Sequence, residues 1–167
     1  RDAKTMLAPP ELKAIHPLGK SPVITDNGRT IAETGAIIDY IIDTYGNGRL
    51  VPAKGSDEYL RYTYWMHYAE GSAMTPLLLK LVFTRIGEAP LPFFVKPVVK
   101  KIVATANSSF IDPELKKVFD YIEDELGKAA WFAGDEFTAA DVQMSFPLEA
   151  AATRAGLDHT RPKTMAF

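Results

Sequence analysis

Apolar residues recur at helical spacing over most of this chain. The first such run covers residues 37–45, and Gly46 ends it. Residues 57–85 predict one long helix with a kink at Pro76. Residues 93–106 predict a second apolar helix. The pattern therefore indicates a mainly helical chain.

Capping signals predict where further helices begin. Asp112-Pro113 suits a helix start, because Asp can cap backbone N–H groups and Pro is tolerated in the first turn. Thr138 and Asp141 have capping-box spacing, with Asp in place of the usual Glu or Gln. We interpret this pair as structural, so that losing Asp141 should cost on the order of 1 kcal/mol or more. Residues 160–162 predict one more helix start.

One segment near the start has the character of a β-hairpin. Residues 22–25 are short and β-branched, and residues 29–32 form a matching second run. Asn27-Gly28 between them is the strongest short hairpin signal, since both residues tolerate positive φ. Two strands are marginal without further partners, so we expect this chain to be part of a longer protein.

The ends of this hairpin carry residues suited to a small charged ligand. Glu33 and Thr34 lie where the second strand turns into a helix, whose unpaired N–H groups suit a carboxylate. The sequence alone favours a trans Ser21-Pro22 bond, whereas a cis bond would present the Ser21 backbone to a peptide. Taken singly, Thr34 suits a helix cap, Glu33 the helix dipole, and Lys20 a solvated loop.

Composition narrows the classes of function. The formal net charge is −2 and no long basic run occurs, so a nucleic-acid surface is not indicated. No stretch is long and apolar enough for a membrane span. The chain has no cysteine, which removes disulfides and a Cys nucleophile from this segment, and its three scattered histidines indicate no metal site.

The ordered set of motifs resembles the cytosolic glutathione transferases. Residues 16–22 read HPLGKSP and residues 33–37 read ETGAI, where the family commonly has NPxGKVP and ESxAI. His16 thus replaces the common Asn, and Ser21 replaces Val. The variant is similar to the yeast-type fungal and bacterial subgroup, as are three further stretches, PPELKAI, YAEGS and AADVQMSFPL.

The resemblance implies an α/β thioredoxin-like N-terminal domain, partial here, followed by an all-α helical C-terminal domain. Residues 1–46 would end the glutathione-binding domain, residues 47–56 would be the linker, and residues 57–167 the helical domain. The family has an earlier strand, helix and strand, and a further C-terminal end, that this chain does not include. The Tyr, Ser or Cys that activates the glutathione sulfur belongs to that earlier part, so the catalytic residue is unknown here.

The resemblance also assigns roles to the hairpin residues. Lys20 would meet the glycine carboxylate of glutathione. The Ser21 backbone would pair with the cysteinyl part, and Pro22 would be the cis-proline. Glu33 and Thr34 would hold the γ-glutamyl amino and carboxylate groups, while His16 would have only a supporting place. In the helical domain an electrophile pocket would include three residues, Tyr64, Tyr68 and Ser72.

The activity implied is conjugation of the glutathione thiolate to a hydrophobic electrophile. Glutathione would be the cosubstrate, no metal would be needed, and the protein would be a cytoplasmic homodimer in detoxification. Two alternatives stay open: a glutathione-dependent peroxidase or thiol-disulfide reductase, and a non-catalytic interaction or regulatory module. A Ser or Tyr at the activating position would favour transfer or peroxidase chemistry, and a Cys would favour disulfide exchange. The electrophile and the pathway do not follow from the sequence.

Overall fold

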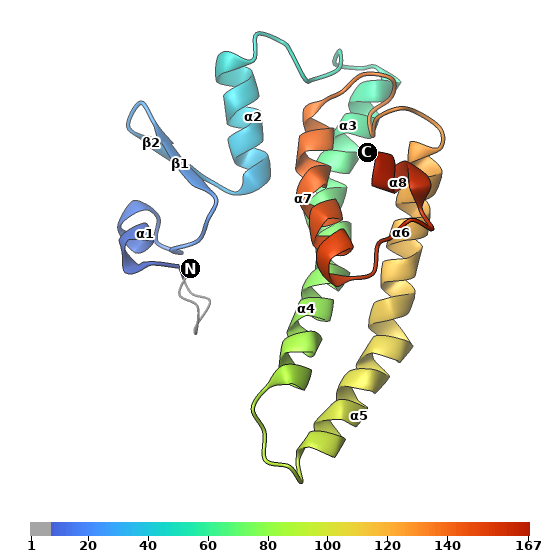
Figure 1. The fold of residues 1–167 in the computed structure, drawn as a ribbon. Helices are drawn as coiled ribbons and strands as arrows, with labels where there is room; N and C mark the ends of the chain where they lie inside the picture. The colour runs from blue at the N-terminus through green and yellow to red at the C-terminus, as the bar shows by residue number, and fades with distance from the viewer. Residues whose placement is uncertain (1–7) are drawn as a thin grey trace. The chain divides into compact units, whose positions relative to one another are not determined.

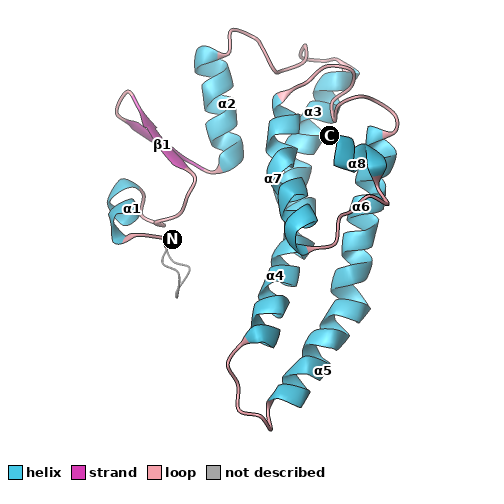
Figure 2. Ribbon diagram, viewed as in Figure 1, coloured by secondary structure: helices cyan, strands magenta, loops and turns pink. Residues whose placement is uncertain are grey.

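The computed structural model describes residues 8–167, which form two compact units (Figure 1). The first unit ends at Val51 and the second begins at Pro52. This division falls inside the predicted linker, residues 47–56. Figure 2 shows the strands in the first unit and the long helices in the second. No helix among the described residues is both long and apolar enough to cross a membrane.

The first unit contains a short helix, a hairpin and a longer helix. Its elements are α1 (Pro10–Ile15), β1 (Val23–Asp26), β2 (Arg29–Ala32) and α2 (Thr34–Tyr45). The strands are antiparallel, with Val23 opposite Ala32 at one end and Asp26 opposite Arg29 at the other. Asn27 and Gly28 between them have φ values of 47° and 75°, which confirms the predicted two-residue turn.

Asp26 holds the hairpin against α2. Its Oδ2 accepts hydrogen bonds from the hydroxyls of Tyr40 at 2.7 Å and Tyr45 at 2.5 Å. The bond from Tyr45, followed by that from Tyr40, lowers the pKa of Asp26, while the same bonds raise the pKa of each tyrosine. One carboxylate thus fixes both strands relative to the helix that starts at their end.

The second unit is helical throughout its regular structure. A continuous helical path consists of α3 (Asp57–Tyr68), a π-helix (Ala69–Ala73) and α4 (Met74–Glu88). A second continuous path consists of α5 (Lys96–Ala106), another π-helix (Asn107–Ile111) and α6 (Asp112–Leu126). The chain then forms α7 (Ala139–Arg154) and α8 (Pro162–Ala166). Figure 1 shows α4 and α5 side by side, joined by a turn.

The structure corrects two predictions about these paths. The long helix deforms at the π-helix before Pro76, where the Met74 N–H donates to the Ala69 carbonyl, so the irregular hydrogen bonding lies in residues 69–73 and not at Pro76 itself. Asp112 does not cap a new helix, because the preceding residues are already helical. Its carboxylate instead accepts a bond from the Lys80 ammonium at 2.7 Å.

Aromatic rings form the centre of the helical unit. Trp65 on α3 is 1% exposed and lies 4.5 Å from the ring of Phe132 and 5.5 Å from that of Tyr121. Trp131 joins the edge of this cluster through Phe167, whose ring lies 5.8 Å from that of Trp131 and 5.0 Å from that of Phe132. The core thus joins α3, α6 and the loop before α7.

Asp141 ties that loop to the start of α7. Its Oδ2 accepts from the Thr138 backbone N–H at 2.7 Å and from the Thr138 hydroxyl at 3.0 Å. Its Oδ1 accepts from the Phe132 N–H at 2.9 Å. The carboxylate is buried, so three donors depend on it in a region without water.

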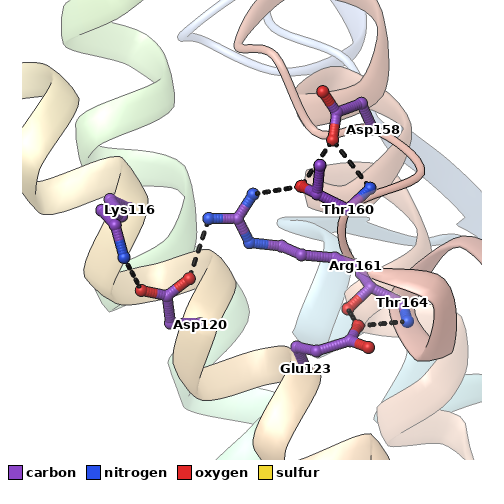
Figure 3. A network of polar contacts seen from close by, with 7 residues as sticks. All are labelled: Lys116, Asp120, Glu123, Asp158, Thr160, Arg161 and Thr164. Carbon is purple, nitrogen blue, oxygen red and sulfur yellow. Dashed lines mark hydrogen bonds and ion pairs between the residues drawn. The ribbon is translucent and has the colours of Figure 1, made fainter.

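Acidic residues of α6 hold the last helix in place (Figure 3). Glu123 accepts hydrogen bonds from the backbone N–H groups of Lys163 at 2.9 Å and Thr164 at 2.8 Å. Arg161 pairs with Asp120 at 2.8 Å. Burial alone would raise the pKa of Glu123, but the hydrogen bonds from Lys163 and Thr164 outweigh it and lower that pKa.

Candidate functional site

A small cavity lies at one end of the hairpin in the first unit. Its volume is about 120 Å³. The residues that line it come from two short stretches: His16, Leu18, Lys20, Ser21, Pro22, Ala32 and Glu33. Four of the five residues predicted to bind glutathione are therefore brought together, and the fifth, Thr34, directly follows Glu33 outside the lining.

A tight turn presents Lys20 to this cavity. His16 ends α1, and its carbonyl accepts the Gly19 N–H at 2.8 Å. Gly19 has φ +56°, and a Cβ there would lie 2.7 Å from the Lys13 side chain. Glycine alone fits both the left-handed backbone and the close approach. The turn leaves Lys20 exposed, next to the start of β1.

Ser21 lies just outside the strand ladder. The pairing of β1 with β2 begins at Val23, so the Ser21 backbone lies beyond the last pair. The Ser21-Pro22 bond is cis. The resemblance implied this isomer, and the preference for trans expected from the sequence alone was wrong.

Glu33 occupies a position that sequence reasoning described only in part. It is the N-cap residue of α2, so the expectation that Thr34 is the cap was wrong, and Thr34 is instead the first helical residue. Glu33 has φ +75°, which is uncommon for a residue other than glycine. Its side chain makes no capping bond. Such backbone strain often accompanies functional sites. The positive φ of Glu33 could not be predicted from the residue type, because Glu does not favour this conformation.

The charges around this cavity suit a ligand that carries both signs. Lys20 supplies an ammonium group and Glu33 a carboxylate, while the first turn of α2 adds unpaired N–H groups. The cavity is smaller than the roughly 300 Å³ at the low end for small-molecule pockets, so it fits part of a ligand and leaves the rest exposed.

A larger cavity of about 470 Å³ lies in the helical unit. It is lined from both helical paths by Tyr68, Gly71, Ser72, Thr75, Pro76, Leu79, Phe110, Glu114, Lys117, Val118 and Tyr121. Tyr68 and Ser72, which were predicted for an electrophile pocket, both line this cavity. Tyr64 is outside the lining, with its ring 5.5 Å from that of Tyr68.

Both tyrosines of this cavity keep their protons at neutral pH. Burial, followed by the nearby Tyr64, raises the pKa of Tyr68 to about 12. Burial also raises the pKa of Tyr121. Their hydroxyls can therefore donate hydrogen bonds inside a mostly apolar space. Sequence reasoning missed Tyr121 and Phe110, although their helical spacing with Glu114 and Val118 could have indicated a shared face.

Neither cavity has the composition of a metal site. Among residues 8–167, no group of three or more His, Asp or Glu side chains is close enough to hold a metal ion.

Comparison with known proteins places both units in one class. Residues 3–49 match the N-terminal domain of glutathione S-transferases, and residues 85–166 match the C-terminal domain. Glutathione S-transferase 1 of Saccharomyces cerevisiae is 31% identical over 161 residues, which cover 92% of this chain and 68% of that protein. Glutathione S-transferase 3 of Schizosaccharomyces pombe is 35% identical over 144 residues, 86% of this chain and 59% of that protein.

The fold agrees with these sequences. A crystal structure of a glutathione S-transferase from Actinobacillus pleuropneumoniae superimposes with a TM-score of 0.75 at 31% identity, covering 95% of this chain and 66% of that one. The fold is thus a partial thioredoxin-like α/β domain followed by an all-helical domain. The chain belongs to the glutathione S-transferase family. It spans about two thirds or less of the length of these relatives.

Proposed function

We propose that this chain belongs to an enzyme that binds glutathione as cosubstrate and transfers its thiolate to a hydrophobic electrophile. The observation that carries the proposal is the hairpin cavity, which brings Lys20, Ser21, Pro22 and Glu33 together in a member of this family. Both charges and the strained Glu33 backbone at one small cavity favour retained glutathione binding over an interaction module that has lost the ligand residues.

Each side chain has a distinct role in holding the tripeptide. Lys20 attracts the glycine carboxylate, and the backbone of Ser21 pairs with the cysteinyl residue beside Pro22. Glu33 accepts hydrogen bonds from the γ-glutamyl ammonium group. Thr34 and the N–H groups at the start of α2 donate to the γ-glutamyl carboxylate.

Holding both ends of glutathione orients the sulfur between them. A free thiol has a pKa near 8.5 and is mostly protonated at neutral pH, whereas the thiolate is the nucleophile. No residue of this chain is assigned here to stabilising the thiolate. The part played by Lys20, Ser21 and Glu33 is therefore positioning, which replaces a bimolecular encounter with a fixed geometry.

The larger cavity of the helical unit is proposed to take the electrophile. Its wall is apolar at Pro76, Leu79 and Phe110, which suits a hydrophobic body. The Tyr68 and Tyr121 hydroxyls remain protonated, so they can donate to a polar atom of the substrate. We further propose that the full-length protein is a homodimer that acts in the cytoplasm, in detoxification.

Calorimetry of glutathione binding to the full-length protein tests the site. The double variant Glu33→Ala, Thr34→Ala should lose binding that the wild type shows in the micromolar to millimolar range. Asp43→Ala, Thr44→Ala removes a matched pair of exposed residues at the far end of the same helix and should bind like the wild type. Conjugation and peroxide assays on the same protein then separate transfer from peroxidase activity.

Two results would overturn the proposal. A folded wild type that binds no glutathione would leave the interaction-module alternative. Equal loss of binding in the Asp43 and Glu33 double variants would show that the effect comes from α2 stability and that the cavity is not the site.

A further inference from the structure

At the end of the hairpin formed by α4 and α5, none of residues 85–102 is buried. Residues 85–102 cover the end of α4, the turn and the first half of α5. Figure 1 shows this end extending past α7 and α8. We call residues 85–102 the hairpin tip.

Large apolar side chains of the hairpin tip face solvent. Phe93 is 85% exposed and Phe94 68%, and their rings touch edge to face at 5.5 Å. Val98 and Ile102 on α5 are 60% and 56% exposed, one helical turn apart. Single exposed apolar residues are ordinary, whereas two adjacent phenylalanines continued by a helical stripe indicate a surface that contacts something apolar.

The same segment is basic, in contrast to the chain as a whole. The hairpin tip contains Arg85, Lys96, Lys100 and Lys101 against the single acid Glu88, in a chain of formal net charge −2. All four basic side chains are exposed. Within residues 8–167 no ion pair joins any of them to a carboxylate. Their charge therefore faces solvent uncompensated by direct contacts.

A cavity at the turn collects part of this charge. Its volume is about 170 Å³, and its lining consists of Gly87, Glu88, Ala89, Leu91, Lys96, Val99 and Lys100. Two ammonium groups against one carboxylate give it a positive balance. A concave basic site of this size, beside two protruding aromatic rings, suits an anionic head attached to an apolar body.

We propose that the hairpin tip docks on a lipid bilayer surface that carries anionic headgroups. Phe93 and Phe94 enter the boundary between headgroups and acyl chains, and Lys96, Lys100 and Lys101 pair with lipid phosphates. A basic amphipathic helix next to exposed aromatic residues is the pattern of an interfacial segment. This property goes beyond glutathione transfer and does not depend on it.

Charge distinguishes this partner from a second copy of the chain. Two hairpin tips brought face to face would place their basic groups together, and like charges at an interface are repulsive. An anionic membrane instead offers opposite charge and an apolar layer at the same surface. Residues 85–102 present the matching basic charge and exposed apolar side chains within one segment.

Cosedimentation of the full-length protein with vesicles tests the proposal. The protein should bind phosphatidylcholine vesicles containing about one third phosphatidylserine more tightly than pure phosphatidylcholine, and added salt should weaken this binding. Lys96→Gln, Lys100→Gln, Lys101→Gln should reduce partitioning by about fivefold per lysine. Phe93→Ser, Phe94→Ser should reduce it by at least about tenfold.

Matched controls use similar residues elsewhere on the helical unit. Phe146→Ser removes an exposed phenylalanine from α7, and Lys54→Gln removes an exposed lysine before α3. Both should bind vesicles like the wild type. Unchanged circular dichroism and an unchanged melting temperature establish that each variant is folded.

Three results would overturn the proposal. The first is a folded wild type that does not bind anionic vesicles. The second is a Phe93→Ser, Phe94→Ser variant that becomes a smaller species by light scattering, which would assign the surface to a second copy. The third is binding to polyglutamate without binding to vesicles, which would assign it to an acidic protein partner.

Discussion

Glu33 combines an unfavourable backbone conformation with a place in the lining of the hairpin cavity, so stability and the proposed glutathione binding should respond in opposite directions to its replacement. Glu33→Gly relieves the positive φ and should raise the free energy of unfolding by about 1 kcal/mol, while glutathione affinity falls. Glu33→Gln keeps the strain and should lose affinity without any gain in stability. Urea unfolding and calorimetry on both variants measure the two effects.

A different result would change the role of this residue. If Glu33→Gly neither stabilises the protein nor lowers glutathione affinity, the backbone of Glu33 is not strained in solution and its carboxylate does not bind the ligand.

Asp141 accepts hydrogen bonds from both the start of α7 and the loop before it, so its loss should lower stability. Asp141→Ala leaves the N–H groups of Thr138 and Phe132 buried without their acceptor, and we expect a loss of about 3 kcal/mol in the free energy of unfolding. Asp135→Ala, at an exposed site in the same loop, should change it by less than about 0.5 kcal/mol. Equal effects of the two substitutions in urea unfolding would contradict this account.

At the scale of elements, the attachment of α8 to α6 should depend on pH. The hydrogen bonds from Lys163 and Thr164 lower the pKa of Glu123 below its ordinary value of 4.5, against the effect of burial. When α8 detaches, this pKa returns to its ordinary value, so acid favours the detached state. The attachment should be complete above about pH 4.5 and weaken as pH falls through the lowered pKa.

Amide hydrogen exchange at Thr164 and Met165 measures this attachment. Protection should fall on acidification in the wild type, after correction for the intrinsic rate. Glu123→Gln should show weak protection at every pH, while Asp124→Asn, at the next and exposed position, should behave like the wild type. Equal protection in Glu123→Gln and the wild type would show that other contacts hold α8.

Element prediction succeeded where the deciding interactions are local. Asn27-Gly28 determines its hairpin through two backbone conformations, and Thr138 and Asp141 bond to each other across three residues. Asp112-Pro113 has an equally good local signal, yet its carboxylate pairs with Lys80, which is 32 positions away in the chain. A π-helix likewise depends on packing between helices, and nothing in residues 69–73 alone requires it.

The sites show the same limit. The order of motifs predicted that Lys20, Ser21, Pro22 and Glu33 act together, and the structure brings these residues, which are close in sequence, to one cavity. The cavity of the helical unit combines residues about 50 positions apart, and the pairing of the two helical paths is needed to bring Tyr121 to Tyr68.

At the scale of the whole molecule, the two units should differ in their capacity to fold alone. In the described part of the first unit, Ile37 and Ile42 are the buried apolar side chains, and a two-stranded sheet is marginal by itself. The helical unit has a core of several aromatic and aliphatic residues. Residues 52–167 expressed alone should therefore keep helical circular dichroism and melt cooperatively, whereas residues 1–51 alone should not.

The opposite outcome, in which residues 1–51 fold in isolation, can also be measured. Dispersed amide resonances from residues 1–51 in isolation would show that Asp26 and its two tyrosine partners stabilise this unit more than its small core suggests.

Both tryptophans of the chain, Trp65 and Trp131, belong to the helical unit. Trp65 has no access to water, so its emission should be blue-shifted until the aromatic core opens. Intrinsic tryptophan fluorescence consequently reports on residues 52–167. Melting confined to the β-hairpin of the first unit would leave this fluorescence unchanged. A denaturation curve followed by this signal describes the helical unit alone, and the unit that ends at Val51 needs a tyrosine or amide probe of its own.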